Sequence, residues 1–240
     1  MASQLVCRPE RDLPVGLLHV SGDLDLITAD ALRRAVGRSL AVQPEALLVD
    51  VADLTVREPE ALQVLDEVGC EAATWPNVPI VLCGGDPAAT TAPLSCALIS
   101  HADSRAEAMT AIGEQPEPRR IRMRLRPVPD ACRQVRQLVN QACTAWQHSD
   151  AAATAALVAT ELVANVVRHA HTTMEFTMGL RDGRLSLAVR DGSRLLPRPA
   201  DPKVSDAGGR GLRLIRELTE SWGVLSVPDG KVVWTHLGVA

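Results

Sequence analysis

The chain has 240 residues, of which 46% are hydrophobic and 22% charged, a composition typical of a globular protein of one large or two ordinary domains. Its net charge of −4 argues against a broad basic surface for nucleic acid, and no apolar stretch approaches the ~20 residues of a membrane span. Residues 1–11 lack the basic and apolar regions of a secretion signal, so we expect a cytoplasmic protein.

Six cysteines are spread along the chain, with no Cys-x-x-Cys pair and no histidine at zinc spacing from them. In a cytoplasmic protein we expect reduced thiols, most of which pack in hydrophobic cores. They are Cys7, Cys70, Cys83, Cys96, Cys132 and Cys143.

The clearest candidate for a domain boundary is the sequence GEQPEPRR at residues 113–120. Its two prolines and flanking charges interrupt any helix or strand. The sequence therefore predicts one domain over residues 1–113, a linker over 114–119 and a second domain over 120–240.

The first half alternates strand-like and helix-like segments, which predicts an α/β domain with helices packed against a sheet. The expected strands cover residues 15–21, 46–51 and 78–83. The expected helices cover residues 28–40, 59–73 and 104–112, with Thr28 as a candidate N-cap and Pro59 in a first turn.

The second half predicts a mixed α+β layer, with helices on one face of a mainly antiparallel sheet. A strand at 121–125 precedes helices at 128–146 and 150–170, the second with Ser149 or Asp150 as N-cap. Strands at 174–180 and 185–189 form a hairpin around an Asp-Gly turn. A polar segment, 191–209, then leads to a helix at 211–220 and a hairpin of strands 224–227 and 232–237.

Glu161 and Asn165 lie one helical turn apart on the same face of the second long helix, beside an apolar stripe of Leu162, Val166 and Ala170. A carboxylate can accept a proton or order a water molecule. An amide oxygen can complete the shell of a Mg²⁺ ion that is otherwise bound by phosphates. Taken alone, such a pair is more often a solvated helix face.

Two further motifs follow in the chain. In Asp191-Gly192-Ser193, a carboxylate at a strand end can accept a hydrogen bond from an exocyclic amine, although an ordinary turn aspartate is the alternative. The sequence GGRG at 208–211 opens a helix, where it can present N–H groups to phosphate or merely cap the helix. No P-loop, βαβ dinucleotide motif or protein-kinase catalytic loop is present, so those folds are not expected.

Together and in this order, the three motifs resemble the GHKL (Bergerat-fold) ATP-binding module over residues 120–240. Within it, they are most similar to the anti-sigma-factor serine kinases, and the closing sequences SWGV and DGKVVW match the actinobacterial branch. The resemblance implies a GHKL α/β sandwich that binds ATP and Mg²⁺. The first glycine box is poorer in glycine than that of gyrase or histidine kinases, and no phospho-accepting histidine helix precedes it, so a histidine kinase is not expected.

The resemblance also implies a role for each matching residue. Asn165 would coordinate Mg²⁺, Glu161 would be the general base toward a serine hydroxyl or a water, and Asp191 would bind the adenine amine. The implied nucleotide-binding residues are Asn165, Asp191, Gly192, Gly209, Arg210, Gly211 and Leu212. Arg168 and His169, one turn beyond, we expect to serve in packing and charge at the helix end.

In the first half, VSGDLDLITADAL at 20–32 and ALLVDVADLT at 46–55 resemble a STAS domain, the anti-anti-sigma fold, over about residues 5–113. In that family the next turn holds the serine that the kinase phosphorylates. Here Glu58-Pro59-Glu60-Ala61-Leu62 offers no hydroxyl. Glu60 is either a first-turn acid favoured by the helix dipole or a regulatory, partial stand-in for phosphoserine with a single charge.

These resemblances imply a regulatory ATP-binding protein of a sigma-factor partner-switching system. It would phosphorylate an anti-anti-sigma (STAS) protein on serine or sequester a sigma factor, with its STAS-like half docked in cis, on a partner or within a homodimer. No nucleic acid or membrane is expected as a partner. The alternative is a non-catalytic ATP-binding or ATP-independent interaction module, whereas a metabolic ATPase is disfavoured because no small-molecule domain is evident.

Overall fold

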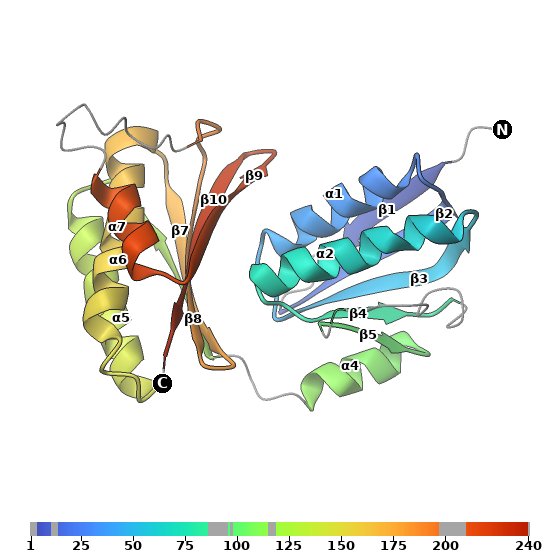
Figure 1. Ribbon diagram of the computed structural model, residues 1–240, viewed down its shortest axis with the longest axis horizontal. Coiled ribbons are helices and arrows are strands. Elements are labelled where there is room, and N and C mark those ends of the chain that lie inside the picture. Colours follow the sequence, from blue (N-terminus) through green and yellow to red (C-terminus); the bar gives the residue numbers. More distant parts are fainter. Residues whose placement is uncertain are drawn as a thin grey trace. The chain divides into compact units, whose positions relative to one another are not determined.

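The computed structural model describes residues 4–10, 14–85, 96, 98–114, 119–196 and 210–239 (Figure 1). The chain divides into two compact units, Met1–Glu117 and Pro118–Ala240.

The N-terminal unit is an α/β layer structure built on a five-stranded sheet in the order β1-β2-β3-β4-β5. β1 pairs antiparallel with β2, and the other pairs are parallel. The strands are β1 (Leu5–Glu10), β2 (Val15–Leu24), β3 (Ala46–Val56), β4 (Ile80–Cys83) and β5 (Ile99–Ala102). The helices are α1 (Ala29–Leu40), the 3₁₀ turn η1 (Pro59–Leu62), α2 (Gln63–Thr74) and α4 (Arg105–Gly113).

Alternation along the strands supplies both faces of this sheet. Leu18 and Val49 pack with α1 and α2 in one core, whereas Leu17 and Leu48 pack with Ala108 of α4 in the other. Figure 1 shows α1 and α2 on one face of the sheet and α4 on the opposite face. The predicted α/β layering is confirmed.

Several details differ from the expectation. Strands β1 and β5 were not predicted, because Pro9 interrupts the pattern of β1, and β5 has the sequence ISHA, in which only two positions are apolar. The helix expected at 59–73 begins with the 3₁₀ turn η1 and becomes α-helical only at Gln63.

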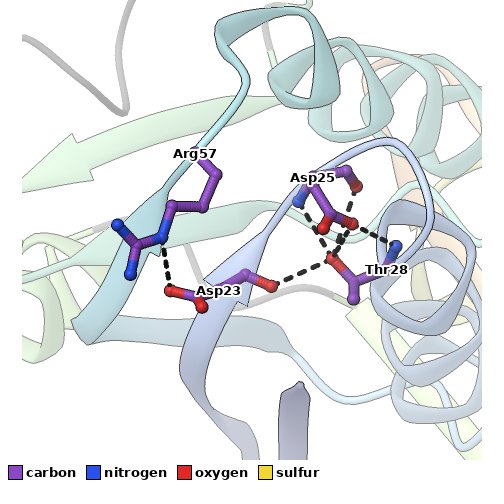
Figure 2. A network of polar contacts seen from close by, with 4 residues as sticks. All are labelled: Asp23, Asp25, Thr28 and Arg57. Carbon is purple, nitrogen blue, oxygen red and sulfur yellow. Dashed lines mark hydrogen bonds and ion pairs between the residues drawn. The ribbon is translucent and has the colours of Figure 1, made fainter. Parts of the chain in front are cut away.

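The turn between β2 and α1 is held by a polar network (Figure 2). Asp25 Oδ1 accepts hydrogen bonds from the backbone N–H groups of Thr28, at 2.8 Å, and Ile27, at 3.0 Å. The Thr28 hydroxyl donates to the carbonyl of Asp23 at 2.9 Å, and Arg57 Nε donates to Asp23 Oδ1 at 2.8 Å. Thr28 occupies the N-cap position, but its side chain does not cap α1, so that part of the expectation is wrong. Asp25 fixes the turn instead.

The C-terminal unit is a single antiparallel sheet with helices on one face (Figure 1). Its strand order is β6-β7-β8-β10-β9, and all neighbouring strands are antiparallel. The strands are β6 (Arg119–Leu125), β7 (Met174–Arg181), β8 (Arg184–Asp191), β9 (Ser221–Val227) and β10 (Gly230–Gly238). The helices are α5 (Asp130–Ala145), α6 (Ala152–Asn165), the π-helical turn η2 (Val166–Ala170) and α7 (Arg210–Leu218).

One hydrophobic core joins this sheet to its three α-helices. Phe176 and Leu187 on the sheet are fully buried against Val135 of α5, Leu162 of α6 and Ile215 of α7. The hairpin β7–β8 turns through Asp182 and Gly183, whose φ values of 48° and 69° are those of a type I′ turn. The sandwich expected from the GHKL resemblance is therefore confirmed as a fold.

The second long helix departs from the expectation at both ends. Its N-cap is Ala151, with no side-chain cap, so the proposed capping by Ser149 or Asp150 is wrong. After Asn165 the backbone changes to the π turn, which ends at His171 in the left-handed conformation. Most of the polar segment expected at 191–209 lies outside the described residues.

All six cysteines are free thiols. Burial raises the pKa of Cys83 to about 11, and burial also raises the pKa of Cys143. A thiol that stays protonated at neutral pH is a poor nucleophile, in keeping with a packing role. Among the described helices, none combines the length and apolarity needed to cross a bilayer.

Candidate functional site

The first part of the site is the C-terminal end of α6. Leu162 and Val163 anchor this turn of the helix in the core. Glu161 and Asn165 are only partly buried and lie at the i and i+4 positions of one face, as their spacing predicted. Asn165 is the last residue before the π turn, a distortion that is frequent at functional sites.

The start of α7 lies directly against this pair. A Cβ atom added to Gly211 would fall 2.6 Å from Glu161 Oε2 and 3.7 Å from Asn165 Oδ1. Only a glycine permits this approach without moving the carboxylate. The structure thus brings Gly211 of the second glycine-rich motif next to Glu161 and Asn165. The nearer of these two in sequence, Asn165, precedes Gly211 by 46 positions.

Asp191 forms the second part of the site. It is the last residue of β8, is 4% exposed, and shares the helix-covered face of the sheet with Leu187 and Val189. Its Oδ1 atom accepts hydrogen bonds from Lys231 Nζ, at 2.9 Å, and from the Ser193 N–H, at 2.7 Å. Its Oδ2 atom is buried and has no hydrogen-bond partner among the described residues.

A buried carboxylate oxygen without a donor is unfavourable unless something else supplies one. The exocyclic amine of adenine is such a donor. This orphaned acceptor, together with the hard amide oxygen of Asn165, fits the Mg·ATP that the sequence motifs imply.

Two residues that sequence reasoning missed contact the Asp191 motif. The Gly192 N–H donates to Thr172 Oγ1 at 3.0 Å, which ties the end of the α6–π segment to the Asp191 motif. Lys231 pairs with Asp191 from the neighbouring strand β10. Lys231 is one of only two lysines in the chain, a signal that could have directed attention to it.

The remaining predicted residues differ in how far they are described. Gly209 lies outside the described residues, and of Arg210 only the backbone at the start of α7 is described. Leu212 packs, partly buried, against the hydrophobic core. Arg168, expected to serve only the helix end, also donates to Glu161 Oε2 at 3.3 Å, whereas His169 is exposed.

In the N-terminal unit, Glu60 is an exposed residue in the first turn of η1. Its neighbour Glu58 makes the contact with the β2–α1 turn, where Glu58 Oε2 accepts from the Leu26 N–H at 3.0 Å. The side chains of Leu26 and Ile27 in that turn are 63% and 86% exposed.

The family described as histidine kinase-like ATPase domain matches residues 125–236. This segment is similar to that family. The match covers Glu161, Asn165, Asp191 and Gly211, so the residues that the fold gathers lie within the segment that is similar to a histidine kinase-like ATPase domain.

Solved structures resemble the chain only at low sequence identity. The RsbU and RsbW domains of a Mycobacterium tuberculosis protein are 17% identical with a TM-score of 0.40, covering 52% of this chain and 33% of that one. An anti-sigma factor antagonist from Mycobacterium paratuberculosis is 24% identical with a TM-score of 0.36, covering 46% of this chain and 96% of that one. A histidine kinase domain from Erythrobacter litoralis is 17% identical with a TM-score of 0.32, covering 44% and 61%. The chain thus spans a third of the first of these structures, and no curated protein matches it significantly.

The close approach of α7 to α6 allows a prediction for Gly211→Ala. The added methyl group meets the flexible end of Glu161, which can swing away, so we expect the melting temperature to be kept. The displaced carboxylate should disturb the site and weaken binding of a fluorescent ATP analogue about tenfold, or ~1.4 kcal/mol.

Gly37→Ala is the matched control, because Gly37 is also helical and a methyl group there would meet nothing within 4 Å. Equal affinities for the Gly211→Ala variant and the unaltered chain would show that the approach of α7 to Glu161 does not shape the nucleotide site.

Proposed function

We propose that this protein is a regulator of a sigma-factor partner-switching system that binds Mg·ATP in its C-terminal unit and phosphorylates an anti-anti-sigma protein on serine. The observation that carries the proposal is the gathering of Glu161, Asn165 and Gly211 at one end of α6. The unpartnered Oδ2 of Asp191 supports it.

When bound, Mg·ATP would supply the transferable phosphoryl group and the charge neutralisation that the transfer requires. The Asn165 amide oxygen would hold the Mg²⁺ ion. Asp191 Oδ2 would accept a hydrogen bond from the amino group of the adenine. Glu161 would accept the proton of the serine hydroxyl as the serine oxygen bonds to the terminal phosphorus and the bond from that phosphorus to the bridging oxygen of ADP breaks.

The N-terminal unit would provide the contact surface for an ATPase unit. Residues 1–117 contain 18 Asp and Glu against 7 Lys and Arg, a net charge of −11. Residues 118–240 contain 11 against 18, a net charge of +7. The exposed Leu26 and Ile27, beside Glu58, combine an apolar contact with an acidic group that a basic partner surface would recognise.

Asn165→Ala and Glu161→Gln separate binding from catalysis. Asn165→Ala should abolish nucleotide binding in the presence of Mg²⁺, since it removes the proposed protein ligand of the ion. Glu161→Gln should bind ATP normally and lose serine phosphorylation by about 10²- to 10⁴-fold, the usual contribution of a general base. Isothermal titration measures the first effect, and radiolabel transfer to a panel of STAS proteins measures the second.

Thr160→Ala is a control on the same helix, since it removes a partly buried hydroxyl that bonds only to the Ala156 carbonyl among the described residues. Undiminished transfer by Glu161→Gln would remove Glu161 from the mechanism. ATP binding by the unaltered chain without transfer to any STAS protein would favour the rival function, a non-catalytic nucleotide-binding module.

Ile27→Asp should weaken docking of the N-terminal unit by about 2 kcal/mol, the range of a central apolar contact. Sedimentation velocity of the full chain would detect the loss as a smaller sedimentation coefficient, through dissociation of a dimer. Met109→Asp, which changes an exposed apolar residue on α4, is the control. If both variants sediment like the unaltered chain, the Leu26–Ile27 turn is not a docking surface.

Glu60→Ser tests whether the turn retains a switch. If Glu60 is a fixed substitute for phosphoserine, the serine variant should accept phosphate in the presence of ATP, and its docking should then differ between the two states. Phosphopeptide mass spectrometry and sedimentation would record both. A variant that is neither phosphorylated nor altered in docking would show that the site is inert.

A further inference from the structure

Lys231 is a buried lysine on the central strands of the ATPase domain, and its environment is built around Asp191. The two residues are directly opposite each other in the register of β10 and β8. Their side chains are 9% and 1% exposed, and Lys231 Nζ lies 2.9 Å from Asp191 Oδ1. Lys231 Nζ also donates to the carbonyl of Ser193 at 3.1 Å.

Burying a charged pair costs much of the solvation of both ions, so such a pair rarely adds net stability. Its well-supported effect is on geometry, because a misplaced buried charge is strongly unfavourable. Here the geometry is specific. Among the described residues, the two donors that reach the carboxylate are the Lys231 ammonium and the Ser193 N–H, and both engage Oδ1 and not Oδ2.

This asymmetry leaves Oδ2 as the one unpartnered oxygen of the Asp191 carboxylate among the described residues. Oδ2 belongs to an anionic group, has no partner among the described residues, and can only accept a hydrogen bond. A purine with an amino group at position 6 satisfies it, whereas a purine with a carbonyl there would set two acceptors against each other.

We propose that Lys231 is a positioning residue that makes the nucleotide site select 6-amino over 6-oxo purines. This inference rests on the proposed ATP site and goes beyond it, because the selectivity comes from a residue that does not touch the purine. Lys231 acts by holding Oδ1 inward, so that Oδ2 is the atom presented to the ligand.

Lys231→Met should change the ratio of the affinities for ATP and inosine triphosphate in opposite directions, depending on whether residue 191 is Asp or Asn. In the unaltered chain, ATP should bind about 10- to 100-fold more tightly than inosine triphosphate, the usual value of a hydrogen bond to a charged group. Lys231→Met should reduce this ratio about tenfold, because the carboxylate, no longer paired, rotates or takes up a proton.

Asp191→Asn with Lys231 retained should reverse the preference. The ammonium group and the Ser193 N–H both require an oxygen, so the amide oxygen turns inward and the amide nitrogen, a donor, faces the base. Adding Lys231→Met to Asp191→Asn frees the amide to rotate and should move the ratio back toward ATP.

The experiment is a titration of ATP and inosine triphosphate, both with Mg²⁺, into the full chain and these three variants. The double variant has no buried charge at this position, so it remains informative if Lys231→Met alone unfolds, as circular dichroism would report. The expected result is that Lys231→Met shifts the ATP-to-inosine ratio in opposite directions, downward where Asp191 is intact and upward where Asp191→Asn is also present.

Shifts in the same direction in both backgrounds, or an equal loss of both nucleotides, would assign Lys231 a structural role only and overturn the proposal. If the unaltered chain binds ATP while the variants give either of these results, the proposed function stays intact. Binding of neither nucleotide by the unaltered chain would overturn both.

Discussion

The buried ion pair between Lys231 and Asp191 is the constraint on which the C-terminal site depends. It links the end of β8 to the start of β10, on the face of the sheet that the helices cover. On the other face, Arg190 Nη2 donates to both carboxylate oxygens of Asp229, at 2.8 and 3.0 Å. The second pair is 70% exposed at Asp229 and contributes little free energy. The position of Asp191 is therefore determined mainly by the buried pair and by the tight β9–β10 turn, where a Cβ on Gly230 would overlap the Asp191 carbonyl.

The other half of the site depends on how closely α7 approaches α6. The contact leaves no room for a side chain at Gly211 unless the Glu161 carboxylate moves, and it places this carboxylate between the start of α7 and the Arg168 guanidinium. The Arg168 and Glu161 side chains are 44% and 25% exposed, so the pair is worth about 0–1 kcal/mol and yields readily to a bound substrate. The pair is thus compatible with a base that is held in place until a hydroxyl arrives.

Much of this arrangement could be predicted from the sequence, and the remainder depends on long-range packing. The Glu161–Asn165 spacing placed both residues on one helix face, since helical periodicity is local. The antiparallel hairpins followed from Asp-Gly turns. Strand β5 could not be predicted, because its four residues become a strand only by pairing with β4. The π turn after Asn165 and the contact between Lys231 and Asp191, 40 positions apart, likewise arise from the packed sheet and carry no local pattern.

The N-terminal unit has no hydroxyl in the turn at residues 58–62, and this bears on how the unit could still recognise a partner. A phosphoserine switches a docking surface because it adds nearly two charges at once, whereas Glu60 carries one charge permanently. On a unit whose net charge is already −11, one fixed carboxylate changes the overall field little. Any discrimination must then come from contacts within a Debye length of about 8 Å. The Asp25 network keeps Leu26 and Ile27 exposed next to Glu58, so the local shape of this turn, more than the charge of Glu60, would decide which partner surface it fits.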